Sequence, residues 1–152
     1  MTLSQYNKRA LFSGLIAAII TGAAAYLLGN VSGYEAKILI ESSLPGINML
    51  CNTVVLASAT ILALLLTLLS ISNSSDSNLN KKLYQQVATA AKLDVVLFVT
   101  AILCFQLFNI PITEADNVPK NWYSSIYWSI LFSSSLLSGG LVSVIIMLYN
   151  TV

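Results

Sequence analysis

Four apolar stretches, separated by short polar segments, divide the chain. They cover residues 10–28, 47–70, 93–110 and 123–149, and none contains a lysine or an arginine. About 20 helical residues cross the hydrocarbon core of a bilayer, and each stretch reaches or approaches that length. Helices are favoured because lipid cannot satisfy exposed backbone groups, and the alternation of a membrane β-barrel is absent. The pattern predicts an all-α fold, a four-transmembrane-helix bundle, with residues 1–152 forming a single integral membrane domain.

The basic residues are unevenly distributed among the polar segments. The N-terminal segment and the middle connection together hold five of the seven: Lys8, Arg9, Lys81, Lys82 and Lys92. The two other connections hold one lysine each. Because cytoplasmic connections are enriched in Lys and Arg, this distribution predicts that both termini are cytoplasmic. We expect the membrane to be the inner (plasma) membrane of a bacterium, with the chain N-in and C-in.

The first outer connection carries the signals of a short helix of its own. Ser32 and Glu35 match a capping box, and Pro45 followed by Gly46 is a helix-ending pair. We expect a short helix between these signals, lying near the outer membrane surface and ending before the second span.

The middle connection becomes amphipathic after a polar stretch at residues 72–78. Leu79, Leu83, Val87 and Ala90 fall on one helical stripe, and no helix breaker separates them from the third apolar stretch. We expect one helix from about residue 78 to residue 110, so that an amphipathic segment extends the third span into the cytoplasm. This segment could dock a cytoplasmic protein partner or a sister subunit, or lie on anionic headgroups. The residues assigned to cytoplasmic docking are Lys81, Lys82, Leu83 and Val87.

Small residues recur at every fourth position in the first and fourth apolar stretches. This spacing keeps them on one helix face, where the missing side chains let another backbone approach closely. We interpret both ridges as helix-packing surfaces rather than as a substrate passage. The two ridges comprise Gly14, Ala18 and Gly22, and Ser135, Gly139 and Ser143.

The second stretch carries a stripe of polar and small residues on a helix otherwise filled with Leu, Val and Ile. At 100° per residue, the members of this stripe lie within about 100° of one another. An asparagine that faced lipid would bury unpaired donors and an acceptor, at a cost of kilocalories per mole. The stripe is therefore expected to face neighbouring helices in a monomer, or copies of itself around a symmetric axis. It consists of Asn48, Asn52, Leu56, Ala59, Ala63, Thr67 and Ser70.

Polar residues of three spans are expected at a similar depth near the outer surface. Beside Asn48 and Asn52, this outer polar cluster comprises Gln106, Asn109, Ser125 and Ser129. The cluster favours a hydrogen-bond network that fixes helix registry, with a hydrated vestibule as the alternative. Cys51 and Cys104 share this depth. Two buried free thiols are expected there, with a disulfide as the alternative.

Asp94 is the only acidic residue inside a predicted span, and it lies at the start of that span. Near the cytoplasmic end we expect it to be an interfacial aspartate that meets water or pairs with Lys92. Proton-coupled transport is then not expected, because no ionisable residue remains at mid-membrane.

Composition narrows the function classes further. Hydrophobic residues make up 57% of the chain and charged residues 9%, against about 25% charged in a soluble domain. Net charge is +1, mean hydropathy is +0.81 and histidine is absent, which disfavours a nucleic-acid binder. No catalytic triad, phosphate loop or metal-ligand spacing is present. We therefore expect no enzyme activity, no cofactor, no metal and no direct nucleic-acid binding; the lipid bilayer is the expected environment.

Two functions fit these features. The first is a homo-oligomeric channel or pore lined by the second span, since four helices of one small subunit cannot enclose a conducting path. The second is a non-conducting membrane anchor or sensor subunit that docks a soluble partner through residues 79–92. The layout of four spans, both ends inside and one basic inner connection resembles the membrane subunits of some bacterial antiviral systems, such as Kiwa, and this resemblance implies the second function. The polar stripe of the second span favours the first.

Overall fold

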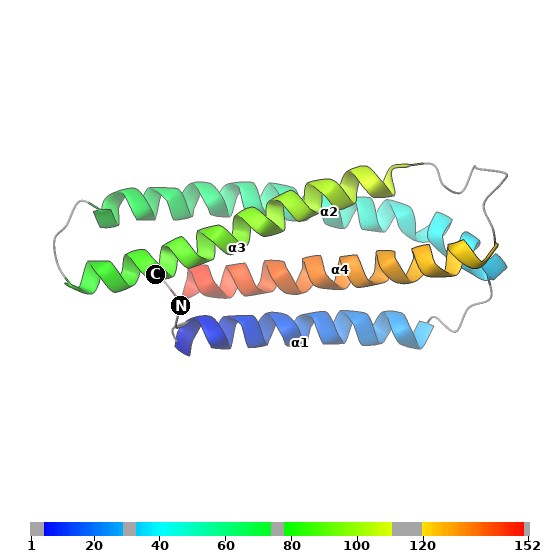
Figure 1. The fold of residues 1–152 in the computed structure, drawn as a ribbon, viewed down its shortest axis with the longest axis horizontal. Helices are drawn as coiled ribbons and strands as arrows, with labels where there is room; N and C mark the ends of the chain where they lie inside the picture. Colours follow the sequence, from blue (N-terminus) through cyan, green and yellow to red (C-terminus); the bar gives the residue numbers. More distant parts are fainter. Residues whose placement is uncertain (1–4, 29–32, 74–77, 111–119, 151–152) are drawn as a thin grey trace.

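The computed structural model describes residues 5–28, 33–73, 78–110 and 120–150. These residues form four helices: α1 (Gln5–Leu28), α2 (Gly33–Asn73), α3 (Asn78–Phe108) and α4 (Lys120–Tyr149). The helices run up and down side by side. The start of α1, the end of α2, the start of α3 and the end of α4 therefore lie at one end of the molecule (Figure 1). The prediction of an all-α fold is confirmed.

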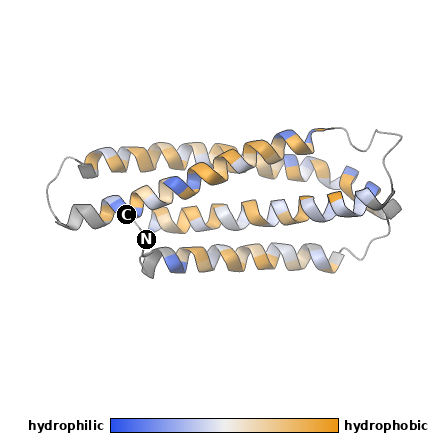
Figure 2. Cartoon of the chain, viewed as in Figure 1, coloured by the Kyte–Doolittle hydropathy of each residue, from blue (hydrophilic) through white to orange (hydrophobic). Residues whose placement is uncertain are grey.

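Three of the helices are long and apolar enough to cross a membrane. The candidate spans are Ala36–Ile71, Leu83–Phe108 and Trp122–Tyr149. Hydrophobic residues recur along the whole length of each, as the colouring by hydropathy shows (Figure 2). By length and composition, these helices are compatible with a small integral membrane protein. The first two begin about ten residues before the predicted starts at 47 and 93, because helix and apolar character continue through the preceding connections.

α2 does not end at the proline, so the prediction of a separate short outer helix is wrong. Pro45 lies inside the helix and removes one backbone hydrogen bond from it. Gly46 does not adopt the positive φ that commonly ends a helix. Ile40 and Ile47 lie on one helix face and are both buried, so packing continues across the proline. The resulting helix has 41 residues and a length of about 60 Å, twice the thickness of a bilayer core.

α3 is a single helix, and the prediction of an unbroken helix is confirmed apart from its last two residues. Its amphipathic start packs against this chain, because Val87 and Ala90 are fully buried. The segment at residues 79–92, which the sequence predicts to dock a partner, thus contributes in part to the chain's own core.

The four helices do not form a symmetric bundle. α2, α3 and α4 pack against one another, whereas α1 packs along α4 and has no comparable interface with α2 or α3 within the described residues (Figure 1). Ala10 is the one hydrophobic residue that α1 contributes to the described core. α4 therefore joins a peripheral helix on one side to the α2–α3 pair on the other.

Candidate functional site

The two ridges of small residues face each other across the α1–α4 interface. A Cβ atom added at Gly14 would overlap the Ser143 hydroxyl and the Gly139 carbonyl oxygen. From the other side, a Cβ atom at Gly139 would lie 2.5 Å from the Gly14 carbonyl oxygen and 2.8 Å from the Ala18 Cβ atom. The backbones approach this closely only because neither glycine carries a side chain.

Hydroxyl groups bond across and along the same interface. Ser135 Oγ donates to the Ala18 carbonyl oxygen at 2.5 Å and lies 3.1 Å from Thr21 Oγ1. Ser143 Oγ donates to the Gly139 carbonyl oxygen at 3.0 Å. Because the backbones touch and these hydroxyls are paired, the interface leaves no room for a passage.

The polar and small stripe of α2 points away from the rest of the chain. The opposite face of the helix carries the buried residues Cys51, Val54, Ser58, Ile61 and Leu65. Asn48 is half-buried, and the other stripe residues are exposed: Asn52, Leu56, Ala59, Ala63, Thr67 and Ser70. Of the two arrangements expected, coverage by neighbouring helices of the same chain is therefore observed only at Asn48.

The polar groups of the stripe differ in how much they need an outside partner. Thr67 Oγ1 donates to the Ala63 carbonyl oxygen of its own helix at 2.6 Å, so its exposure to lipid costs little. Asn52 makes no hydrogen bond to the described residues, and a carboxamide has two donors and an acceptor to satisfy. Asn52 is thus the stripe residue with the strongest need for another molecule.

Only part of the outer polar cluster comes together. Asn48 Nδ2 donates to Asn109 Oδ1 at 3.1 Å, and Asn109 Nδ2 donates to the Phe105 carbonyl oxygen at 2.8 Å. Asn48 Oδ1 is buried without a partner among the described residues. Gln106 is exposed and takes no part. The pair of asparagines ties α2 to the chain at the C-terminal end of α3.

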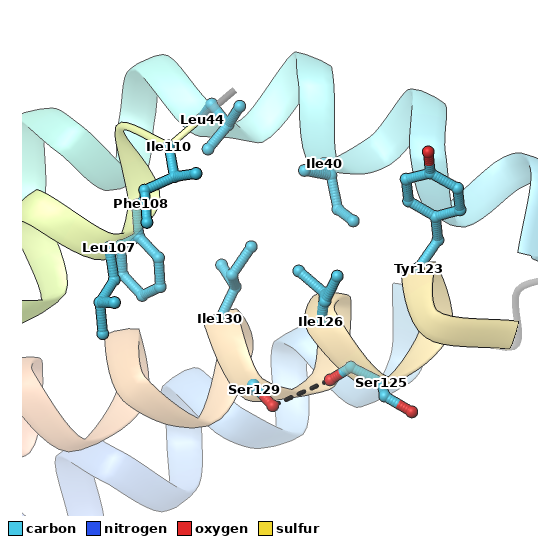
Figure 3. Close-up of a pocket in the computed structure, with 10 residues that line it drawn as sticks. All are labelled: Ile40, Leu44, Leu107, Phe108, Ile110, Tyr123, Ser125, Ile126, Ser129 and Ile130. Carbon is cyan, nitrogen blue, oxygen red and sulfur yellow. Dashed lines mark hydrogen bonds between the residues drawn. The ribbon is translucent and has the colours of Figure 1, made fainter. Parts of the chain in front are cut away.

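An apolar cavity of about 250 Å³ lies at the same end, between α2, the end of α3 and the start of α4. Ile40 of α2 points towards Ile126 and Ile130 of α4 across it (Figure 3). Ser125 and Ser129 lie at its edge, where Ser129 Oγ donates to the Ser125 carbonyl oxygen at 2.9 Å. Leu44, Leu107, Phe108, Ile110 and Tyr123 complete the lining. The space is thus lined almost wholly by apolar groups, unlike the hydrated vestibule considered from the sequence.

The docking surface assigned to α3 is smaller than expected. Val87 is fully buried, so its assignment to docking is wrong. The physical reason is that the apolar stripe of this segment packs on the chain's own core. Leu83 is half-buried, and the side chains of Lys81 and Lys82 lie outside the described residues.

Cys51 and Cys104 lie on the facing sides of α2 and α3. Both thiols are free and buried, and they are close enough to interact electrostatically. Ser133 of α4 lies beside Cys104. The sequence places the two cysteines at one depth, and the structure places them together.

Asp94 is a buried residue, and the prediction of an interfacial aspartate is wrong. Its side chain is 0% exposed, and it lies near the middle of the candidate span Leu83–Phe108. The carboxyl group lies beside the Ser58 hydroxyl of α2. Neither carboxyl oxygen, nor Ser58 Oγ, has a hydrogen-bond partner among the described residues. Lys92, the expected partner, has an exposed side chain and does not pair with Asp94.

The sequence holds a signal that could have revealed this burial. Val87, Ala90, Asp94, Leu97 and Ala101 follow one another at intervals of three or four residues, and all of them are buried. Asp94 thus occupies a core position of the same stripe that begins in the amphipathic segment. The early start of the span moves Asp94 from its boundary to its interior.

No family model, no curated protein and no solved structure matches the chain.

Proposed function

We propose that the chain is a four-span membrane protein that assembles with copies of itself around α2 and forms a pore along the α2 stripe. Three apolar helices support the membrane location. α1 serves as the fourth span in this proposal. Residues 10–28 carry no charge, α1 runs beside the candidate span of α4, and Phe12, Leu15 and Ile19 are exposed on it. Such an apolar outer face suits contact with acyl chains.

The distribution of charged and aromatic residues supports cytoplasmic termini in a bacterial plasma membrane. Lys8 and Arg9 are exposed at the end of the molecule where α3 begins with two further lysines. At the opposite end, the rings of Tyr26 and Trp128 are 5.9 Å apart, and Trp122 is exposed. Tyr and Trp are enriched at membrane interfaces because one end of each ring system is apolar and the other can meet water.

The observation that carries the proposal is the uncovered stripe of α2, and Asn52 above all. Its carboxamide is exposed on a mainly apolar helix, and a symmetric axis would give it either water or the Asn52 of another copy. Ala59 and Ala63 are small enough to form a narrow middle in such a pore. The uncharged lining predicts weak selectivity between ions.

The alternative, a non-conducting anchor or sensor for a cytoplasmic protein, draws less support. With Val87 packed in the core, the described part of this segment of α3 offers a partner the half-buried Leu83 and scattered exposed side chains such as Tyr84 and Gln85. The α2 stripe, by contrast, is open along most of the helix.

Disulfide cross-linking in native membranes tests the assembly. In a Cys51→Ala, Cys104→Ala background, we expect Asn52→Cys and Ala59→Cys each to yield a covalent dimer on oxidation. Phe132→Cys on α4 is the matched control, because Phe132 is 71% exposed on a different helix. A dimer through position 132, with none through position 52 or 59, would contradict assembly around α2.

Planar-bilayer recording tests conduction separately. We expect the purified oligomer to conduct small ions, and Asn52→Leu to reduce the current because it removes the carboxamide at the outer part of the stripe. Silence of the wild-type oligomer across voltage and osmotic tension, when the Ala59→Cys variant still cross-links, would rule out the pore and leave the assembly standing.

A further inference from the structure

Asp94 and Ser58 form a polar pair in an otherwise apolar part of the core. Both side chains are 0% exposed, and they face each other from α3 and α2. None of their three oxygen atoms has a hydrogen-bond partner among the described residues. An unpaired carboxylate in a low-dielectric interior is costly by several kcal/mol, so such a group requires a compensating ligand. Ionisable residues inside membranes commonly mark the routes of ions or protons.

We infer that Asp94 and Ser58 form a proton-binding site in the membrane-embedded core, in which the carboxyl group takes a proton from water and returns it, with the Ser58 hydroxyl as its hydrogen-bond partner. This inference goes beyond the proposed pore and does not require it. It applies equally to one chain and to an assembly.

The described charges offer no alternative partner for the carboxylate. α2 carries no charged residue from position 42 to its end, and α4 carries none after Lys120. On α3 itself, Lys92 is exposed and faces away from the core. The other titratable groups of the two facing helices are Cys51, the residues before position 42 of α2, and Lys120 and the tyrosines of α4; Ser58 is the polar side chain that lies beside the carboxyl group. A basic residue from a partner chain cannot reach Asp94, because the side chain is fully enclosed.

A metal ion fits the site poorly. The described residues include no group of three or more His, Cys, Asp or Glu side chains that could hold one. Calcium takes six to eight oxygen ligands, and magnesium needs near-ideal octahedral coordination. The pair supplies three oxygens, and backbone carbonyls within a helix are already bonded along the helix. A proton needs only one oxygen to bind and one to accept its hydrogen bond.

Protonation removes the charge and gives the pair one hydrogen bond, in either of two arrangements. A proton from water adds to one carboxylate oxygen, which makes the group neutral and turns that oxygen into a donor. The new O–H can donate to Ser58 Oγ, while the serine hydroxyl can donate to the other carboxyl oxygen in the alternative arrangement. Release reverses the step: the O–H bond breaks and the proton returns to water.

The packing beside the pair keeps this site dry. Leu97 lies one turn along α3 from Asp94, and its Cδ1 atom would be only 2.7 Å from a Cβ atom added at Gly140 of α4. The missing side chain at Gly140 therefore lets α4 close over α3 next to the pair. Proton exchange then requires a transient separation of α2, α3 and α4, which would also move the helix that carries the stripe.

Infrared spectroscopy of the protein in lipid vesicles tests the inference directly. In the difference between wild type and Asp94→Asn, we expect the C=O band of a protonated carboxyl group. This band should convert into carboxylate bands as the pH is raised and return when the pH is lowered. In Ser58→Ala the band should persist at a shifted frequency, because its hydrogen-bond partner is gone. Ser129→Ala, whose hydroxyl bonds to its own helix, is the control and should leave the band unchanged.

Three results would overturn the inference. The difference spectrum could contain only carboxylate at every pH, or a protonated band that never converts while the protein stays helical. Replacing Na⁺ by choline at constant pH could alter the band as a pH change does, which would assign the site to a cation. If Asp94→Asn fails to fold, the pH-dependent spectra of Ser58→Ala and Ser129→Ala are compared with that of the wild type. An equal effect of the two substitutions on the carboxyl band would show that Ser58 is not the hydrogen-bond partner of Asp94.

Discussion

The α1–α4 and α2–α3 interfaces join helices of the same apolar character in opposite ways. In the first, Gly14 and Gly139 bring two backbones into contact, and Ser135 and Ser143 bond their hydroxyls to carbonyl oxygens. In the second, a contact of similar extent is made mostly by apolar side chains, yet it buries Asp94 and Ser58 without a described hydrogen-bond partner.

The difference separates a structural interface from a candidate functional one. Buried polar groups are nearly always hydrogen-bonded, and departures from that rule concentrate at functional sites. The α1–α4 interface follows the rule, because its hydroxyls are hydrogen-bonded and its small residues are accounted for by close helix packing. The α2–α3 interface breaks it at Asn48 Oδ1 and, with an ionisable group, at Asp94 and Ser58 near the middle of a candidate span, where packing alone would have favoured an apolar residue.

Adding a methyl group to the α1–α4 contact should have the largest effect. Gly14→Ala is expected to lower the free energy of unfolding by about 1–3 kcal/mol, because the new Cβ atom meets backbone atoms that cannot move aside. Gly46→Ala is the matched control, since no atom lies within 4 Å of its added Cβ. It should stabilise the helix by about 0.5–1 kcal/mol. Unfolding in mixed micelles followed by circular dichroism measures both, and equal shifts would contradict the close contact.

Breaking the asparagine pair should have an intermediate effect on the other interface. Asn109→Ala removes the acceptor for Asn48 Nδ2, and the expected loss is about 0.5–1.5 kcal/mol, in line with hydrogen bonds between membrane helices. Gln106→Ala, an exposed neighbour on the same helix, should change stability by less than about 0.5 kcal/mol. The same unfolding assay compares them. A larger loss in Gln106→Ala would place the α2–α3 contact elsewhere.

Removing a hydroxyl from the stripe should have the smallest effect. Thr67→Val keeps the side-chain shape and deletes a hydroxyl that bonds only to its own helix, so we expect a change of less than about 0.5 kcal/mol. Cross-linking through position 52 should persist in this variant. A marked loss of stability or of cross-linking would show that Thr67 reaches another molecule.

Much of the fold follows from the sequence by itself. The apolar lengths and the absence of strand-like alternation determine helices of membrane-spanning size, since these are properties of each segment alone. The four-residue spacing of Gly14, Ala18 and Gly22 marks a packing face for the same reason. The structure then shows which helix that face meets.

Tertiary structure decided what depends on neighbours that are distant in the chain. Whether Pro45 ends a helix was settled by Ile40 and Ile47, which pack on the other helices from both sides of it. The spacing of its stripe marks Asp94 as a core position, but only the tertiary structure decided that α2 and α4 are the helices that cover it. The uncovered stripe of α2 has the same origin: periodicity defines a helix face, but only the arrangement of the other helices decides whether that face is covered.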